Sequence, residues 1–534
     1  RASTSPASPT LTRARTPPSF ASRFTRMSAP LAHTRASHVL SATSPHVPVN
    51  AWDRSTPMGT HDVPETFRVK GLHLTDHFIS CPIDWNNPET SPTMRVFVRE
   101  VVKSSRGNDD EAKRASLPSV LFLQGGPGFE AGRPDASGGW IGELVNEHRV
   151  FLLDQRGTGR SDAELVRVPA NAELGDWQPE VFVGGDADAD WAKNAARLLM
   201  CFRADSIVKD AELIRRTILG HTGENTTWTL LGQSFGGFCI TTYLSFAPEG
   251  VKEALYTGGL PPLTHEKASA EGAYRELFKR VIAQNEKYYA RFPQDIERVC
   301  YLLRYCSEHV VRLPGGGRLG ATLIKALGFS NLGTASGMER LHFMLENVVI
   351  GQPISHKVLI DIENTFRHFS TNPLYGILHE SIYCNEGNAY GGANEAMKAF
   401  AREFDHTDVL SGAENKKVYF TGEMVFKEFF DKEFGVEELK PYARVRDVFA
   451  SSASSAWSKL YDDEQLARTT APVACASYVE DMFVDFNLAA ETAGKIKGAR
   501  VWSTSEYMHS GIREDGAKIV KTLLAYTREE DPIR

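Results

Sequence analysis

The chain has 534 residues, of which 42% are hydrophobic and 24% are charged, and it carries a formal net charge of −7. This length exceeds the usual size of one domain, so we expect a large core with an insertion or a second lobe. The mixed, slightly acidic charge provides no field that would attract nucleic acid or anionic lipid, and no apolar run is long enough to cross a bilayer. We therefore predict a soluble globular protein with neither nucleic acid nor a membrane as a partner.

The first 52 residues differ in composition from the rest, because they hold six Arg, many Ser, Thr, Pro and Ala, and no acidic residue. This composition fits an organellar transit peptide, a disordered tail, or sequence upstream of a start at Met27, and we favour the latter two. The seven cysteines are odd in number and scattered, which favours free thiols in a reducing compartment, so we expect a cytoplasmic protein. No cysteine or histidine spacing predicts a metal site.

From about Phe67 onward, short apolar runs alternate with stretches of helical length. The strand-like runs are FRVKGLHLTDHFISCPIDW, MRVFVREVVK, SVLFLQ at 119–124, VFLLD at 150–154, TWTLLGQ at 227–233 and EALYTGG at 253–259. Between two of them lies DWAKNAARLLMCFRADSIVKDAELIRRTIL, which predicts helix. Such alternation predicts an α/β protein with a mostly parallel sheet and helices on both faces.

After residue 262 the alternation stops, and residues 263–465 are predicted to be largely helical. Strand signals return in PVACASYVED at 472–481 and ARVWSTSEY at 499–507, and the helix GAKIVKTLLAYTR ends the chain. We therefore predict a disordered or targeting segment over 1–52 and a core made of 53–262 and 466–534. A large helical cap over 263–465 interrupts that core, and its length is typical of a domain.

Residues Gly232-Gln233-Ser234-Phe235-Gly236 match G-x-S-x-G, a pattern that is weak by itself. Its context strengthens it, because it follows the apolar strand TWTLL and precedes a plausible helix. This strand-to-helix turn lifts a nucleophilic serine above the sheet edge in the α/β-hydrolase fold, and its glycines allow the close backbone approach. Ser234 is therefore the predicted nucleophile.

A serine nucleophile needs a histidine base, which needs an orienting acid, and in this fold they follow in the order Ser, acid, His. His509 is the one histidine after the last strand signals. Asp481 ends a predicted strand, where active groups gather in parallel sheets. We favour Asp481 as the acid, with Asp485 as its rival and Glu480 as a weaker alternative.

Acyl transfer also needs donors for the oxyanion. We expect the backbone N–H of Phe235 as one donor, and the N–H of Gly126, with Gly125 in reserve, as the other. Both glycines follow the strand VLFL, and Pro127 has no N–H to offer. The segment lacks the glycine spacing or lysine of a phosphate-binding loop. The stretch DQRGTGRSD at 154–162 is interpreted as a loop brace with structural roles for Asp154 and Arg156.

These motifs together resemble the proline iminopeptidase (prolyl aminopeptidase) family of α/β-hydrolases. The residues that carry the resemblance are Gly125-Gly126-Pro127-Gly128, DQRGTGRSD, GQSFGG at 232–237, TGGLPP at 257–262, and the spacing from Asp481 to His509. The resemblance covers most of the chain from about residue 67. It implies cleavage of an N-terminal residue, typically proline, from short peptides with a free N-terminus, without metal or cofactor.

Two features depart from the family pattern. Gln124 stands where much of the family has His, and the helical region is much longer than in compact members, which points to the larger-subunit branch. In the family, cap glutamates bind the substrate's free amino group. Glu380 in LYGILHESIYC and Glu423 in VYFTGEMVF are the candidates here, and Glu380 is the stronger of the two.

The leading hypothesis is therefore a serine aminopeptidase that acts through an acyl-enzyme. A general esterase or amidase could use the same triad without needing a free amine. Epoxide and haloalkane hydrolysis are disfavoured, because on this fold those reactions use a carboxylate where Ser234 stands. A binding protein that keeps the fold without catalysis is the alternative from another class.

Overall fold

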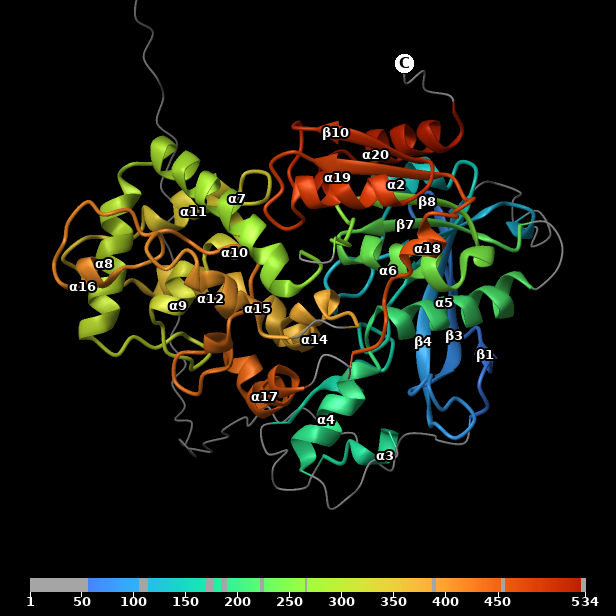
Figure 1. The fold of residues 1–534 in the computed structure, drawn as a ribbon, viewed down its shortest axis with the longest axis horizontal. Helices are drawn as coiled ribbons and strands as arrows, with labels where there is room; N and C mark the ends of the chain where they lie inside the picture. The colour runs from blue at the N-terminus through green and yellow to red at the C-terminus, as the bar shows by residue number, and fades with distance from the viewer. Residues whose placement is uncertain are drawn as a thin grey trace, which may run out of the picture. The chain divides into compact units, whose positions relative to one another are not determined.

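The computed structural model describes residues 56–104, 114–169, 177–183, 190–220, 225–264, 267–386, 390–452 and 457–529. The predicted segment 1–52 lies outside the described residues. The described residues form one sheet with helices packed on it and, beside it, a group of helices from residues 270–451, as Figure 1 shows.

Over the residues that the structure describes, the sheet has ten strands in the order β1-β3-β4-β6-β5-β7-β8-β9-β10, with β2 paired to β3. From β6 through β10 all neighbours are parallel, whereas β1 to β4 and the β4–β6 pair are antiparallel. The prediction of a mostly parallel sheet is confirmed. The strands are β1 (His61–Asp62), β2 (Thr66–Val69), β3 (Leu72–Pro82), β4 (Thr93–Lys103), β5 (Ser119–Leu123), β6 (Arg149–Leu153), β7 (Trp228–Gln233), β8 (Val251–Thr257), β9 (Val473–Tyr478) and β10 (Ala499–Thr504).

The central strands are apolar on both sides because helices cover both faces. Along β5, Val120 and Phe122 enter one hydrophobic core, and Leu121 and Leu123 enter the other. Helices α2 (Gly139–Leu144) and α20 (Gly511–Thr527) cover the first face, and α5 (Ala204–Leu219), α6 (Phe235–Phe246) and α19 (Phe486–Lys495) lie on the second (Figure 1). Two-sided burial explains the uninterrupted apolar runs in the sequence.

One predicted helical stretch is two helices in the structure. Helix α4 (Trp191–Met200) ends before Cys201, and α5 begins at Ala204 after Arg203, whose φ of −90° and ψ of 176° are extended. Arg203 uses this break to reach another part of the chain, because its guanidinium donates to the carbonyl oxygens of Ser381 (3.1 Å) and Cys384.

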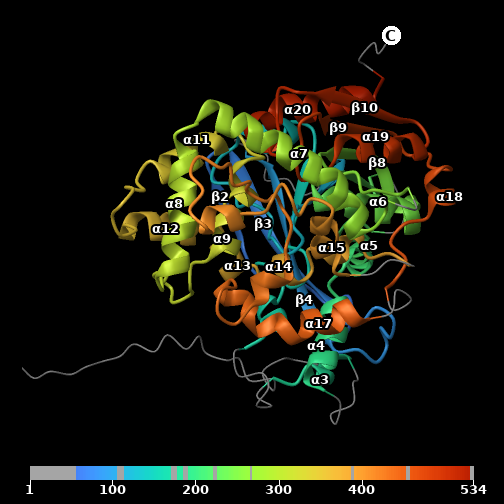
Figure 2. The ribbon, with the colours of Figure 1, turned by 60° about the vertical axis from the view of Figure 1, so that its left-hand side comes forward.

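Helices fill the stretch between β8 and β9, as expected for the cap, although its boundaries at 263 and 465 stay a prediction. Its core is continuous with that of the second sheet face. Helix α17 (Ala443–Ser451) lies beside α4 (Figure 2). The helices of this stretch, with 3₁₀ helices marked η, are α7 (Ala270–Arg291), α8 (Asp295–Glu308), α9 (Ala321–Lys325), α10 (Gly328–Asn331), α11 (Gly337–Leu345), α12 (His356–Phe366), α13 (His368–Thr371), α14 (Pro373–Ile377), η5 (Glu380–Tyr383), α15 (Gly392–Lys398), α16 (Thr407–Leu410), η6 (Lys427–Phe430), η7 (Glu437–Tyr442), α17 (Ala443–Ser451) and α18 (Asp463–Leu466).

The DQRGTGRSD segment forms the loop brace predicted for it. Asp154 is fully buried and accepts hydrogen bonds from the backbone N–H groups of Ala131 (3.2 Å) and Arg160 (2.9 Å). Arg156 is equally buried and forms a two-pronged ion pair with Asp210, at 2.6 and 2.7 Å. These contacts fix the loops that follow β5 and β6, next to the predicted oxyanion segment.

Close backbone packing shapes the turn after β7. A Cβ atom added at Gly236 would lie 1.9 Å from the carbonyl oxygen of Leu123 in β5, and one added at Gly237 would lie 2.2 Å from the carbonyl oxygen of Gly259 after β8. Both distances are far below any real contact. Glycine is therefore required at these positions so that α6 can start directly behind the neighbouring strands.

Gly236→Ala is expected to lower the free energy of unfolding by about 3 kcal/mol, because the strand or the helix must move to admit the methyl group. Gly494→Ala is the matched control, since Gly494 lies in helix α19 with no atom within 4 Å of its added Cβ. It should be neutral or stabilise by up to about 1 kcal/mol. Denaturant unfolding of both variants checks this, and a Gly236→Ala protein as stable as the wild type would contradict the packing argument.

Candidate active site

Ser234 stands at the turn between β7 and α6 in a backbone conformation that serine rarely adopts. Its φ is 55° and its ψ is −124°. The neighbouring backbone holds it there, because its N–H donates to the Thr257 carbonyl (3.1 Å) and its carbonyl accepts from the Gly237 N–H (2.7 Å). Such strain persists only where the surroundings fix it, and it is typical of functional turns.

The loops after β9 and β10 bring Asp481 and His509 together. His509 Nδ1 lies 2.8 Å from Asp481 Oδ2, and the other carboxylate oxygen, Oδ1, accepts hydrogen bonds from the N–H groups of Phe483 (2.8 Å) and Val484 (3.1 Å). Asp481 is 1% exposed. The Phe483 ring stacks on the imidazole with ring centroids 4.6 Å apart. The carboxylate therefore has a fixed orientation and holds the ring by its Nδ1 edge.

The electrostatics of this pair favour a basic imidazole. Burial alone would lower the pKa of His509, but the Asp481 carboxylate, and to a smaller extent Glu423, more than offset it. The net effect is a pKa above the usual value for histidine. A neighbouring negative charge stabilises the protonated ring, which is what a general base requires when it accepts a proton.

The two rival carboxylates have other partners. Asp485 caps helix α19, since its Oδ1 accepts from the N–H groups of Asn487 (2.9 Å) and Leu488 (3.1 Å). Glu480 is partly exposed and pairs with Lys287. Of the three candidates for the acid, the structure joins Asp481 to His509.

Ser234 and His509 line the same cavity, which has a volume of about 290 Å³. It lies where loops from the sheet meet helices of the predicted cap. Its lining residues are Gln124, Gly125, Gly126, Phe129, Gln233, Ser234, Phe329, Ser330, Thr334, His368, Tyr375, Glu423, Phe483, His509, Ser510 and Arg513.

The predicted oxyanion segment lies against the nucleophile. Gly125 and Gly126 line the cavity, and a Cβ atom added at Gly125 would lie 3.0 Å from Cβ of Ser234. Phe235 is the first residue of α6, so its N–H has no acceptor within the helix. Gln124, which departs from the family's His, is held through its carbonyl oxygen by Gln155 Nε2 at 2.9 Å.

The two predicted glutamates have different surroundings. Glu423 lines the cavity, and the Tyr375 hydroxyl donates to its Oε1. Burial raises the pKa of Glu423 to about 7, although His509 and the Tyr375 hydroxyl favour its charged form. The side chain remains partly accessible, as expected for a group at a cavity wall. A carboxylate at the cavity wall can meet a ligand directly.

Glu380 is 2% exposed and is absent from the cavity lining. Its Oε2 accepts from the N–H of Gly391 and its Oε1 from the N–H of Ala393, both at 2.7 Å, at the start of α15. Burial raises the pKa of Glu380 to about 7 despite these bonds. The oxygens of Glu380 thus stabilise the start of α15. Of the two glutamates, the structure brings Glu423, and not Glu380, to the cavity that Ser234 lines.

Several cavity residues were missed by sequence reasoning, namely Phe129, Phe329, His368, Tyr375, Phe483 and Arg513. The first four form an aromatic wall in which Phe129 and Tyr375 have ring centroids 4.8 Å apart, whereas Phe483 stacks on His509. Burial lowers the pKa of His368 to about 4, so this ring is neutral at pH 7. Arg513 follows His509 by four residues, and that proximity was a signal that could have identified it.

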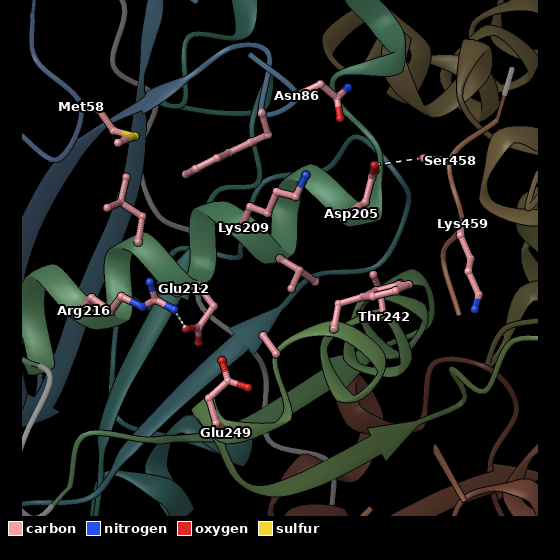
Figure 3. A pocket seen from close by; sticks show the side chains of 15 residues that line it. Met58, Asn86, Asp205, Lys209, Glu212, Arg216, Thr242, Glu249, Ser458 and Lys459 are labelled. Carbon is pink, nitrogen blue, oxygen red and sulfur yellow. Dashed lines mark hydrogen bonds and ion pairs between the residues drawn. The ribbon is translucent and has the colours of Figure 1, made fainter. Parts of the chain in front are cut away.

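A larger hollow of about 530 Å³ lies between α5, α6 and the segment around Ser458 (Figure 3). Asp205 accepts a hydrogen bond from the Ser458 hydroxyl there (2.9 Å), and Glu212 pairs with Arg216. None of the predicted site residues lines this hollow. We therefore place the candidate site in the smaller cavity, where Ser234 is.

Within the part of the chain that the structure describes, no group of three or more His, Cys, Asp or Glu side chains could hold a metal ion. In the same ranges, no helix combines the length and the apolar character needed to span a membrane.

Comparison of the sequence with known proteins places the chain in a family. Residues 118–297 match the family model described as alpha/beta hydrolase fold. The proline iminopeptidase of Aeromonas sobria is 39% identical over 466 residues, which cover 87% of this chain and 99% of that protein. The proline iminopeptidase aneH of Aspergillus aculeatus is 29% identical over 450 residues, covering 83% of this chain and 91% of that protein.

The solved structure of the proline iminopeptidase of Mycobacterium smegmatis aligns with 85% of this chain at 14% identity and a TM-score of 0.33. The assignment rests on the sequence relatives, which match nearly their whole length and support the resemblance and the fold class predicted from the motifs. The chain belongs to the proline iminopeptidase family of α/β-hydrolases.

Proposed function

We propose that the chain is a serine aminopeptidase that releases an N-terminal residue, preferentially proline, from short peptides. The observation that carries the proposal is the composition of one cavity. It holds Ser234, the Asp481-bound His509 and a carboxylate, Glu423, that can meet a free amine. The names of the two relatives support the same substrate class.

In the proposed reaction, His509 Nε2 accepts the proton of the Ser234 hydroxyl while Oγ attacks the carbonyl carbon of the N-terminal residue. The backbone N–H groups of Gly126 and Phe235 stabilise the oxyanion, and the N–H of Gly125 is the alternative to that of Gly126. The C–N bond breaks, and His509 passes its proton to the leaving amine. Water then attacks the acyl-enzyme and gives a proton to His509, which returns it to Ser234 and frees the amino acid.

We propose Glu423 as the residue that binds the substrate amine. A cationic amine leaving water for a partly buried cavity needs a carboxylate to offset its desolvation. Glu423 faces the cavity and is oriented by Tyr375, whereas both oxygens of Glu380 already accept backbone N–H groups. We assign Glu380 to the support of helix α15. The aromatic wall around Phe129 and Tyr375 offers an apolar surface for the pyrrolidine ring.

The first test compares a proline amide that carries a fluorogenic leaving group with its N-acetylated counterpart. Turnover should require the free amine. Glu423→Gln should raise KM for the free-amine substrate about tenfold or more, because a charge-assisted contact is lost. Glu380→Gln, the matched control, should lower thermal stability and leave that KM near the wild-type value. If the wild-type protein hydrolysed the free and the N-acetylated amide equally, or hydrolysed simple esters alone, it would be a general esterase or amidase.

Asp481→Asn is expected to lower kcat about 10³- to 10⁴-fold, since an amide there would favour the wrong imidazole tautomer. Asp485→Asn keeps a side chain that can still cap α19, so its kcat should stay within about threefold of the wild type. Steady-state kinetics separates the two variants, and the opposite ranking would assign the acid role to Asp485.

Ser234→Ala should abolish both turnover and labelling by a fluorophosphonate probe. A wild-type protein that the probe does not label would instead point to a binding protein without catalysis.

The pH dependence of kcat/KM should have a steep acid limb. Glu423 must be ionised to attract the amine, and its pKa of about 7 means that it gains a proton as the pH falls through that value. His509 must be neutral to act as a base, and it too gains a proton as the pH falls, at a higher pH than an ordinary histidine because its pKa is raised. The logarithm of kcat/KM should therefore approach a slope of two in wild type and one in Glu423→Gln. A slope of one in both proteins would exclude Glu423 from amine binding.

A further inference from the structure

Arg513 is a cation in the candidate active site that the proposed chemistry does not use. It lies near the start of α20, lines the cavity together with Ser234 and Glu423, and keeps an exposed side chain. A side chain that both lines a cavity and meets solvent stands at the cavity mouth. Its guanidinium can therefore reach a ligand that extends out of the cavity.

Two buried arginines of the sheet and its loops are bound to carboxylates. Arg156 pairs with Asp210 at 2.6 Å, and Arg99 pairs with Asp76 at 2.6 Å. For Arg513 the described residues provide no ion pair, and its Nη2 donates at 3.3 Å to the neutral Oε1 of Gln233. This is a long bond that uses one of five N–H donors, so most of the guanidinium fork is available to a ligand.

The cavity thus carries one anionic and one cationic group that are not paired with each other. Glu423 is oriented by Tyr375, and Arg513 by Gln233 beside the nucleophile. A short peptide has the complementary arrangement, with a free amine at one end and a free carboxylate at the other. The cavity volume of about 290 Å³ also limits the enclosed part of the ligand to a few residues.

We propose that Arg513 binds the C-terminal carboxylate of the substrate, which makes dipeptides with a free C-terminus the preferred substrate class. This inference rests on the proposed aminopeptidase function, since the amine is taken to lie at Glu423. The guanidinium fork matches the two carboxylate oxygens. Arg513 is then a specificity-determining residue that binds the substrate on the C-terminal side of the scissile bond, in the amino acid that forms the leaving group.

The test uses a prolyl dipeptide with a free C-terminus and the same dipeptide as its C-terminal amide, with kcat/KM measured for both. In the wild type the acid should be the better substrate. Arg513→Gln should lower the ratio of acid to amide kcat/KM about fivefold or more, a modest effect because the group is partly exposed. Arg513→Lys, which keeps the charge and loses the fork, should give an intermediate ratio.

Arg340 provides a matched control. It is an exposed arginine in an adjacent hollow that shares Ser330 and His368 with the cavity, and it donates to Thr334 Oγ1 (2.7 Å) and the Ala335 carbonyl (2.9 Å). Arg340→Gln should leave the acid-to-amide ratio unchanged. Added salt should lower the wild-type ratio and not that of Arg513→Gln, since the contact is ionic.

Equal losses for acid and amide in Arg513→Gln would overturn the inference, because a structural role through Gln233 affects every substrate alike. Unchanged kcat/KM values for both the acid and the amide would overturn it too. Failure of the aminopeptidase function gives a different result, in which the wild type cleaves neither dipeptide form and hydrolyses esters only.

Discussion

The candidate site depends on one constraint, the close approach of backbones around the turn at Ser234. The serine keeps its left-handed φ of 55° because the Thr257 carbonyl and the Gly237 N–H hold it from both sides. That arrangement is feasible only where Gly236 and Gly237 touch the neighbouring strand ends without a side chain. The packing of the sheet therefore supports the local strain at Ser234, because it fixes the backbone groups that bind the serine.

The second constraint on the candidate site is the electrostatic interaction of His509 with two carboxylates. Two carboxylates, Asp481 and Glu423, act on one imidazole, and both favour its protonated form. Their own environments differ, because Asp481 accepts two backbone N–H groups whereas Glu423 has the Tyr375 hydroxyl and a pKa of about 7. One carboxylate is thereby fixed to the histidine, and the other keeps an oxygen for a ligand. Both side chains end in a carboxylate, and it is the environment of each carboxylate that separates their proposed roles.

The core of the fold could be predicted from sequence because its signals are local. Apolar runs marked the strands, and the G-x-S-x-G context and the chain order selected Ser234, Asp481 and His509, which the structure brings together. The ranking of the glutamates could not be predicted. Glu380 and Glu423 both lie among aromatic residues in the sequence, and only tertiary packing shows that α15 occupies the oxygens of Glu380. The split between α4 and α5 likewise coincides with contacts of Arg203 to distant carbonyl groups, which the local sequence does not show.

The residues at which the helical region contacts the loops of the sheet were the hardest to predict from the sequence, because these contacts join distant parts of the chain. Asn372, just before α14, donates to the carbonyl of Gly128 (2.9 Å) in the segment that follows the predicted oxyanion glycines. Three residues later, Tyr375 orients Glu423. A single short helix therefore contacts the oxyanion segment and orients the proposed amine-binding carboxylate. Displacement of α14 would disturb both at once, so substrate binding and oxyanion stabilisation in this chain are coupled through the packing of the helical region.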